Sequence, residues 1–270
     1  MQKRFFYLIF CVLFPLFLSC QAPRSPQNNA ENITATTNTP EPIIGVWDVS
    51  TVDISKVNTN KKLVAFSFDD APAKCLEELI ATFVSFNEKN PDCHASATLF
   101  CNGKRINERS IATLQMATAL GFELGNHSFS HADLTKLSKS ELLWEIDKTD
   151  ELLKGVDGKA RHLLRTPYGN TNTLVKETAK TPIIDWTVDT LDWTGKGADT
   201  IYQTVISQVY SGAIVLFHDG YLETITAVKK LLPALKEKGY QVVSVSQLCK
   251  AHDCPLKNGS VYIRARKKSD

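Results

Sequence analysis

Two adjacent aspartates and two histidines at close spacing are the residues most suited to chemistry in this sequence. Asp69 and Asp70 follow an apolar segment, where two neighbouring carboxylates can be buried only with a cation or with a shifted pKa. His127 and His131 are four residues apart and would face the same way on a helical turn. Two imidazoles and one carboxylate form a three-ligand zinc site that leaves one position open for water.

Other ionisable residues stand where predicted strands end. Arg165 ends one apolar segment, Asp189 follows another and His218 follows a third. In parallel α/β folds the carboxyl ends of the strands meet on one face, where sites are built. We therefore expect these residues to lie near the aspartates and histidines.

The elements that must position these residues alternate regularly from residue 61 onward. Short β-branched and aromatic segments predict strands at 63–68, 96–101, 122–126, 161–165, 182–188, 213–217 and 240–245. Amphipathic segments between them predict helices over 76–86, 110–120, 139–153, 200–210 and 225–238. Gly121 and Gly239 stand where helix C-caps belong. The pattern predicts a parallel sheet covered by helices on both faces, either open or closed into a barrel.

Composition and motifs exclude several classes of protein. The 270 residues carry 31 basic and 29 acidic side chains, too even a balance for a dedicated nucleic-acid binder. No GxGxxG or GxxxxGK[ST] segment follows the first predicted strand, so no nucleotide is expected. The hydrophobic fraction of 43% is that of an ordinary globular protein.

Five ordered segments carry a family resemblance that spans about residues 61–248. They are Ser67-Phe68-Asp69-Asp70, His127-Ser128-Phe129-Ser130-His131, Arg165-Thr166-Pro167-Tyr168, Asp189-Thr190-Leu191-Asp192-Trp193 and Leu216-Phe217-His218. Together they resemble the motifs of the polysaccharide deacetylases, carbohydrate esterase family four, which share the NodB homology domain. The resemblance implies an α/β fold, a distorted barrel of seven or eight parallel strand–helix units, in a single catalytic domain.

The resemblance also implies a role for each matching residue. The divalent metal would be held by Asp70, His127 and His131. Asp69 would be the general base, oriented by Arg165. His218 would be the general acid, tuned by Asp189. The backbone N–H of Tyr168 would help to bind the oxyanion, and Trp193 and Leu216 would line the pocket for the acetyl methyl group.

Two positions depart from the family pattern. Ser67 replaces the usual threonine and keeps a hydroxyl. Ala71 stands where the family has glycine before Pro72. If that position required a positive φ, alanine would be strained or the loop would be displaced.

The N-terminal residues predict export and a lipid anchor. Lys3 and Arg4 precede an apolar segment from Phe5 to Leu18, which is short for a membrane span but typical of a signal peptide. It ends at Cys20 in a pattern that resembles a bacterial lipoprotein box, and an ordinary cleaved signal is the alternative. We predict a signal over 1–20, a tether and extension over 21–60, a catalytic domain over 61–250 and a tail over 251–270.

Five cysteines remain once Cys11 and Cys20 are set aside, so an oxidising compartment would leave at least one unpaired. The pairing among Cys75, Cys93, Cys101, Cys249 and Cys254 is left open by the sequence. Cys75 with Cys101 and Cys249 with Cys254 are the two hypotheses for disulfides, because each pair could come close in the predicted fold.

The leading functional hypothesis is a metal-dependent hydrolase that removes N-acetyl groups from amino sugars of an extracytoplasmic polysaccharide such as peptidoglycan or a chitin-like chain. One alternative is an esterase acting on O-acetyl groups of xylan. Another is a non-catalytic sugar-binding lipoprotein, which the presence of Asp69 and His218 argues against. The ligand set favours Zn²⁺, with Co²⁺, Ni²⁺ and Mn²⁺ as alternatives. The expected partners are the polysaccharide and, through the anchor, a membrane.

Overall fold

The computed structural model describes residues 45–266. The predicted signal peptide, Cys20 and most of the predicted tether lie outside the described residues, as do residues 267–270. Within the described part of the chain, no helix is long and apolar enough to cross a membrane.

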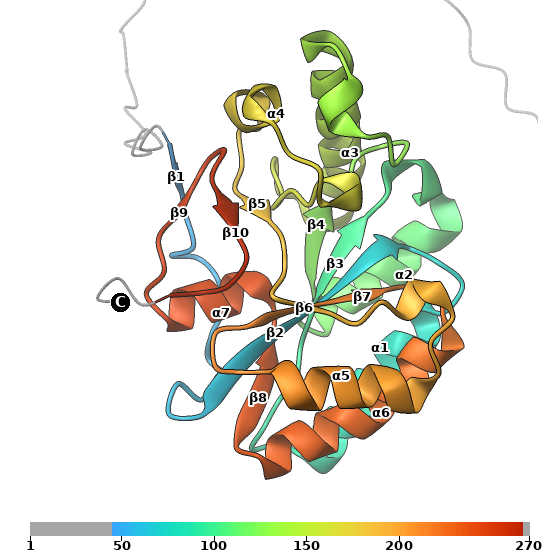
Figure 1. Ribbon diagram of the computed structural model, residues 1–270, viewed down its shortest axis with the longest axis vertical. Helices are drawn as coiled ribbons and strands as arrows, with labels where there is room; N and C mark the ends of the chain where they lie inside the picture. Colours follow the sequence, from blue (N-terminus) through green and yellow to red (C-terminus); the bar gives the residue numbers. More distant parts are fainter. Residues whose placement is uncertain (1–44, 267–270) are drawn as a thin grey trace, which may run out of the picture. The chain divides into compact units, whose positions relative to one another are not determined.

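A parallel sheet forms the centre of the fold (Figure 1), and β2 (Lys62–Ala71) lies in its middle. One edge of β2 pairs with β7 (Ile214–His218), and the other pairs first with β8 (Tyr240–Val243) and then with β3 (Thr98–Cys101). The outer strands are β4 (Glu123–Asn126) beside β3 and β6 (Val188–Asp189) beside β7. All of these pairs are parallel, as the nearly continuous apolar segments predict.

Single bridges continue the sheet beyond β4. Leu164 bridges both Asn126 of β4 and Ile183 of β5 (Ile183–Ile184), and β5 pairs in parallel with β10 (Val261–Tyr262). An antiparallel bridge from Arg264 to Ala213 then leads back to the start of β7. The pairing thus runs around a distorted ring, and the predicted α/β fold with parallel strands is confirmed.

Helices pack against the strands on both sides of β2. They are α1 (Leu76–Lys89), α2 (Glu108–Ala119), α3 (Lys139–Asp157), α4 (Thr173–Thr178), α5 (Ala198–Gln208), α6 (Leu222–Glu237) and α7 (Val245–Ala251). The side chains of β2 alternate between two cores, because successive residues of a strand point to opposite faces. Phe66 and Phe68 pack in the core shared with helices such as α1 and α6, whereas Leu63 and Ala65 belong to the second core.

Most predicted elements are present, with ends that differ by a few residues. Gly121 and Gly239 follow α2 and α6 with φ of +95° and +81°, the left-handed conformation that the C-cap prediction required. The strand expected over 182–188 is instead two short strands, β5 and β6. β1 (Val46–Trp47) and β9 (Leu256–Lys257) form an antiparallel pair, so segments expected to be extension and tail contribute to the folded body.

The five cysteines of the described residues are buried and free, contrary to both disulfide hypotheses. Cys249 and Cys254 do approach each other, because the two thiols share a hydrogen bond. That contact raises the pKa of the Cys249 thiol, and burial adds to the effect. The sequence spacing therefore located a thiol pair at the end of α7 but not a covalent bond.

Candidate metal and acid–base site

The predicted metal ligands converge at the carboxyl ends of the strands. Asp70 lies near the end of β2, His127 directly follows β4, and His131 lies in the loop beyond it. One ligand atom from each residue lies within 4.8 Å of the other two, which is a three-residue cluster able to hold a cation. The structure thus brings together the three residues that the motifs predicted as ligands.

Hydrogen bonding orients His127 toward this cluster. Its Nδ1 lies 2.8 Å from the carbonyl oxygen of Arg165, so Nδ1–H donates there and Nε2 is the nitrogen that is available to a metal. His131 Nε2 lies 3.7 Å from Asp70 Oδ1. Burial and the nearby His127 lower the pKa of His131, which favours the neutral imidazole that a metal requires.

The donor set fits a divalent metal on chemical grounds. Two imidazole nitrogens and one carboxylate oxygen are the ligands of many zinc sites that keep a position open. His127 is almost fully buried, while Asp70 and His131 are partly exposed, so the cluster has a dry side and a side that solvent or substrate reaches.

Asp69 differs from its neighbour because a buried cation compensates its charge. Nη1 of the fully buried Arg165 donates to Asp69 Oδ1 at 2.8 Å, and the same nitrogen donates to the Ser67 hydroxyl at 2.8 Å. Burial by itself would raise the pKa of Asp69, but the charges of Arg165, His127 and His218 and the hydrogen bond from Arg165 together outweigh it, and the pKa is lowered. Asp69 Oδ2 faces the cluster, 3.6 Å from His127 Nε2. Asp69 is therefore a carboxylate held beside the metal ligands.

The partner of His218 is Asp192 and not Asp189, which corrects the sequence-based prediction. His218 Nδ1 lies 2.8 Å from Asp192 Oδ1, and Asp192 Oδ2 accepts the His218 backbone N–H at 2.8 Å. Asp189 Oδ1 instead accepts the backbone N–H of Leu191. Leu191 has a left-handed backbone with φ of +52°, and the turn that it makes brings Asp192 to the histidine.

The Asp192 contact determines the protonation of His218. Burial alone would lower the pKa of His218, but the hydrogen bond to Asp192 and the charge of Asp69 outweigh it, and the pKa is raised. His218 is therefore suited to be the protonated partner at neutral pH.

Asp192→Asn should consequently shift the pH dependence of the reaction. Without the carboxylate, burial lowers the pKa of His218, so the alkaline limb of the pH–rate profile should move to lower pH. At alkaline pH the rate should fall by as much as about 10²–10⁴-fold, the range for losing a positioned acid. Profiles of kcat/KM test this, with Asp189→Asn as the matched carboxylate control. An unmoved limb in Asp192→Asn, or a moved limb in Asp189→Asn, would contradict the assignment.

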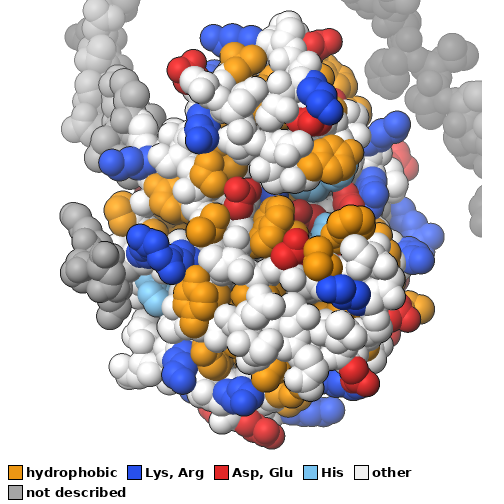
Figure 2. Space-filling model, viewed as in Figure 1, with side chains coloured by type: hydrophobic (Ala, Val, Ile, Leu, Met, Phe, Trp, Pro, Cys, Tyr) orange, Lys and Arg blue, Asp and Glu red, His pale blue; other side chains and the backbone are white. Residues whose placement is uncertain are grey.

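Aromatic side chains surround the opening of the site. Tyr168 is 65% exposed and its ring packs edge-on against His131, with centroids 4.8 Å apart. Trp193 is 54% exposed, whereas Leu216 is buried on β7 two residues before His218. In the space-filling view, acidic and histidine atoms reach the surface in a hollow between hydrophobic side chains (Figure 2).

The loop after Asp70 accommodates the departure at Ala71. The left-handed residue is Asp70, with φ of +65°, and Ala71 is not among the described residues with positive φ, so the alanine is not strained. Ala71 joins Pro72 through a cis peptide bond. The Ala73 N–H donates to Asp219 Oδ2 at 2.6 Å, and burial raises the pKa of Asp219 to about 6. The second departure, Ser67, uses its hydroxyl to join Arg165 to the carbonyl of Val215.

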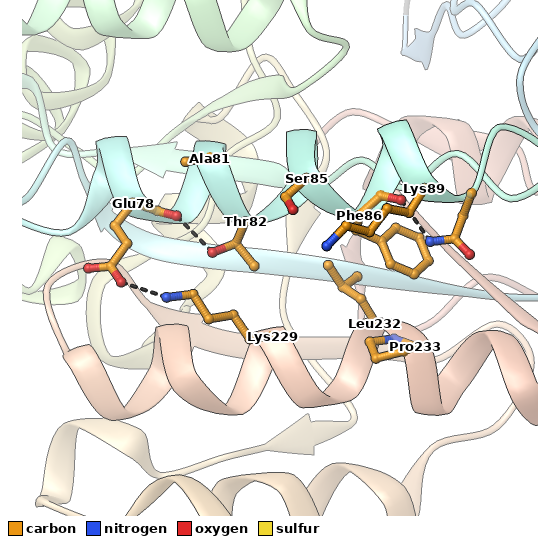
Figure 3. A pocket seen from close by; sticks show the side chains of 10 residues that line it. Glu78, Ala81, Thr82, Ser85, Phe86, Lys89, Lys229, Leu232 and Pro233 are labelled. Carbon is orange, nitrogen blue, oxygen red and sulfur yellow. Dashed lines mark hydrogen bonds and ion pairs between the residues drawn. The ribbon is translucent and has the colours of Figure 1, made fainter.

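A separate cavity of about 400 Å³ lies between α1 and α6 (Figure 3). Glu78 and Lys229 form an ion pair across one end of it, with Nζ and Oε1 2.7 Å apart. Phe86 and Leu232 supply apolar lining at the other end, and none of the ten lining residues is a predicted site residue. The cavity lies in the helix layer and not at the strand ends.

Comparison with known proteins agrees with this geometry. The family model described as "Polysaccharide deacetylase" matches residues 56–182. A peptidoglycan-N-acetylglucosamine deacetylase of Bacillus cereus is 31% identical over 211 residues, which is 72% of this chain and 91% of that protein. The chain belongs to the polysaccharide deacetylase family.

Two further relatives of the family show how far the similarity extends. The peptidoglycan-N-acetylmuramic acid deacetylase PdaC of Bacillus subtilis is 33% identical over 192 residues, covering 71% of this chain but only 40% of PdaC. The solved PdaC structure superposes with a TM-score of 0.66 at 32% identity, covering 73% of this chain and 94% of that one. An acetyl xylan esterase of Clostridium thermocellum, solved with a cobalt ion, has a TM-score of 0.68 at 26% identity and covers 75% and 98%.

Several residues that support the site were not predicted from the sequence. Asp192 belongs to one of the five motifs, but the family resemblance assigned no role to it. Glu145 and Asn126 bind the loop that carries the histidines, and nothing in the sequence distinguished either of them from an ordinary helix or strand residue. His162 lies buried between Asp150 and Asp157. The sequence did make Asp192 a candidate partner of His218, since Asp192 and Asp189 are the two acidic residues of one motif.

Proposed function

We propose that this protein is a metal-dependent deacetylase that removes N-acetyl groups from amino sugars of peptidoglycan, releasing acetate. The observation that carries the proposal is that the Asp70, His127 and His131 cluster lies beside Asp69, a carboxylate compensated by Arg165. His218, an imidazole bound to a carboxylate, lies opposite Asp69 on the adjacent strand. Such a site combines a place for a metal with a base and an acid. The names of the PdaC and Bacillus cereus relatives support peptidoglycan as the polymer.

We propose Zn²⁺ as the metal, held by Asp70, His127 and His131. When bound there it would polarise the acetamide carbonyl and lower the pKa of a coordinated water. Asp69 would take the proton from the attacking water, since its Oδ2 faces the cluster while its Oδ1 is fixed by Arg165. The chemistry requires Asp69 to stay ionised, and the charge of Arg165 is the largest of the contributions that lower its pKa.

His218 would then donate a proton to the departing amine. An amine is a poor leaving group unless protonated, so a residue with a raised pKa near the cluster meets this need. The backbone N–H of Tyr168 would stabilise the oxyanion that forms on attack. Trp193 and Leu216 would surround the acetyl methyl group, and their aromatic and aliphatic character suits a small apolar group.

The xylan esterase hypothesis remains as the second candidate. The similarity to the acetyl xylan esterase favours it, because a water activated by the same base and metal can attack an ester carbonyl. The two functions differ in how much they need His218, since an alcohol leaves more readily than an amine. The third hypothesis, sugar binding without turnover, has no support in a site where Asp69 and His218 are both present and paired.

Acetate release tests the proposed function directly. The purified, zinc-loaded protein is incubated in parallel with peptidoglycan, N-acetylglucosamine oligomers and acetylated xylan, and acetate is quantified in each. Release from peptidoglycan with little from xylan supports the proposal, and the reverse order supports the esterase. A His218→Ala control in each arm reports whether the release depends on the site, and release that persists at full rate would contradict the mechanism.

We further propose that the chain is exported and anchored by lipid at Cys20. The apolar segment that ends at Leu18-Ser19-Cys20 supports this, as does the extracytoplasmic polymer on which the relatives act. The catalytic domain would be residues 61–250, extended in the folded body by the β1 and β9 pair.

Cys20→Ala should remove the anchor. A lipoprotein modification supplies the two acyl signals that durable membrane attachment needs, and alanine cannot accept them. The variant should therefore appear unprocessed or in the soluble fraction, whereas wild type should sediment with membranes and label with a fatty-acid probe. Cys11→Ala, which changes a cysteine within the same segment, is the control. Membrane association and processing unchanged in Cys20→Ala would end this reading.

A further inference from the structure

The loop that carries both histidine ligands has a costly backbone conformation. Ser128 and His131 have φ of +63° and +62°, in the left-handed region. Residues with a Cβ lose of the order of 1–2 kcal/mol each in that conformation relative to the right-handed one. Such conformations persist only where the surrounding structure fixes them. The contacts that fix this loop therefore bear on how well the ligands are placed.

Glu145 of α3 supplies three of those contacts. Its side chain is buried, with 5% of the residue exposed, and points into the loop. Oε2 accepts the backbone N–H groups of Phe129 and Ser130, each at 2.8 Å, and Oε1 accepts the Ser130 hydroxyl at 2.5 Å. All three bonds go to residues that lie between His127 and His131. One carboxylate thus fixes the middle of the loop.

A second connection runs from α3 through Asn126. The Asn126 amide donates to Asp150 Oδ1 at 3.0 Å and to the Ile146 carbonyl at 2.9 Å. Its oxygen accepts the Ser128 N–H at 2.9 Å, and the Ser128 hydroxyl in turn accepts the His131 N–H at 3.1 Å. Asn126 is fully buried, so water does not compete for these bonds.

His162 forms a hydrogen bond with Asp150, the residue of α3 that contacts Asn126. Its Nδ1 lies 2.9 Å from Asp150 Oδ1 and its Nε2 lies 3.2 Å from Asp157 Oδ1. A ring with a carboxylate on both nitrogens satisfies both only when both nitrogens carry protons. Burial lowers the pKa of His162, but its hydrogen bonds to the two aspartates outweigh burial and raise the pKa. The buried charge of Asp150 is therefore compensated.

We propose that α3 positions the metal ligands, with Glu145 as the main positioning residue and Asp150, acting through Asn126, as the second. Neither carboxylate is one of the cluster ligands; each holds the strained loop whose ends are His127 and His131. The inference deepens the proposed function and rests on it, because it assumes that the cluster binds a metal. Outer partners of this kind are typically worth about 10–100-fold in metal affinity.

Zinc affinity measured without any turnover assay tests the proposal. The Kd of Zn²⁺ for the metal-free mature protein is obtained by competition with a chromophoric chelator. Glu145→Ala should raise that Kd by about 10–100-fold. Glu145→Gln should restore most of the affinity, because its amide oxygen can accept both backbone N–H groups and its NH₂ can donate to the Ser130 hydroxyl. The matched control is Glu151→Ala, an exposed glutamate of the same helix that pairs only with Lys148 among the described residues.

Ser130→Ala keeps the proposal testable if Glu145→Ala does not fold. Ser130 is exposed, and the substitution removes only its hydroxyl bond to Glu145, so the zinc Kd should rise about threefold to tenfold. Asp150→Asn should produce a smaller rise than Glu145→Ala. A folded Glu145→Ala protein with wild-type zinc affinity would overturn the inference, as would wild-type affinity in Ser130→Ala when the other variant is unfolded. A wild-type protein that binds no metal would count against the proposed function instead.

Discussion

Asp69→Asn should keep its metal and lose its activity, whereas Asp70→Asn should lose its metal. The two residues are neighbours on β2, but Arg165 already binds Asp69, while Asp70 is the carboxylate of the three-ligand cluster. An asparagine at position 69 can still accept the Arg165 hydrogen bond through its amide oxygen, so the fold should be retained. It cannot take a proton from water, and turnover should fall by about 10²–10⁴-fold.

Metal content and rate, measured on the same samples, separate these two outcomes. Each variant is purified, dialysed against a defined zinc buffer and analysed for zinc by elemental analysis beside the rate of acetate release. Asp70→Asn should be metal-poor, since a neutral amide replaces the charged ligand. Excess zinc should partly restore Asp70→Asn but not Asp69→Asn. Loss of metal in Asp69→Asn with retention in Asp70→Asn would reverse the assignment of the two carboxylates.

Arg165→Met should be the most destabilising of the site substitutions. Arg165 is fully buried, its Nε donates to the Ile184 carbonyl at 2.9 Å, and its guanidinium lies 4.1 Å from the centre of the Phe100 ring. Removing it leaves the Asp69 carboxylate buried without its cation, which typically costs about 3–5 kcal/mol of the free energy of unfolding. Urea unfolding at pH 8 measures the loss. Lys148→Met, which breaks an exposed pair with Glu151, should cost at most about 1 kcal/mol.

The pH dependence of the stability, together with the double variant Arg165→Met/Asp69→Asn, identifies the cause of that loss. Without Arg165, burial should raise the pKa of Asp69 in the folded protein above its unfolded value. The deficit should therefore be largest above that raised pKa and should shrink as the pH falls through it, because the protonated acid is less costly to bury. Adding Asp69→Asn to Arg165→Met should recover part of the stability at pH 8. A deficit that is independent of pH, and that the second substitution does not reduce, would mean that lost packing is responsible.

The sequence predicted the fold because its local signals and its tertiary structure agree. The apolar segment at 63–68 is flanked by strand partners on both edges and lies in the middle of the sheet, so every face of it is buried. The positions of Asp70, His127 and His131 followed from motifs at strand ends, where parallel topology brings distant residues to one face.

What could not be predicted depends on the direction of single side chains. Motif spacing placed Asp189 and Asp192 in one short segment, but the left-handed turn at Leu191 determines which of them reaches His218. The two-residue strands β5 and β6 are too short for a period to appear, so their segment read as one strand. The contacts of Glu145 join residues 15 and 16 positions apart across a helix and a loop, and a sequence pattern carries no signal for them.

The central position of β2 also has a consequence for the order in which the molecule assembles. The Ser67 hydroxyl bonds to the Val215 carbonyl across a separation of 148 residues, and β8 pairs with the start of β2 from still further along the chain. Contacts of such long range make folding slow, because a large loop must close before they form. During synthesis β2 emerges early, whereas its neighbours β7 and β8 are synthesised near the end of the chain. The apolar side chains of β2 therefore stay exposed until those strands are available. The proposed export would benefit from this delay, because a chain that crosses a membrane through a translocation channel has to be unfolded while it crosses.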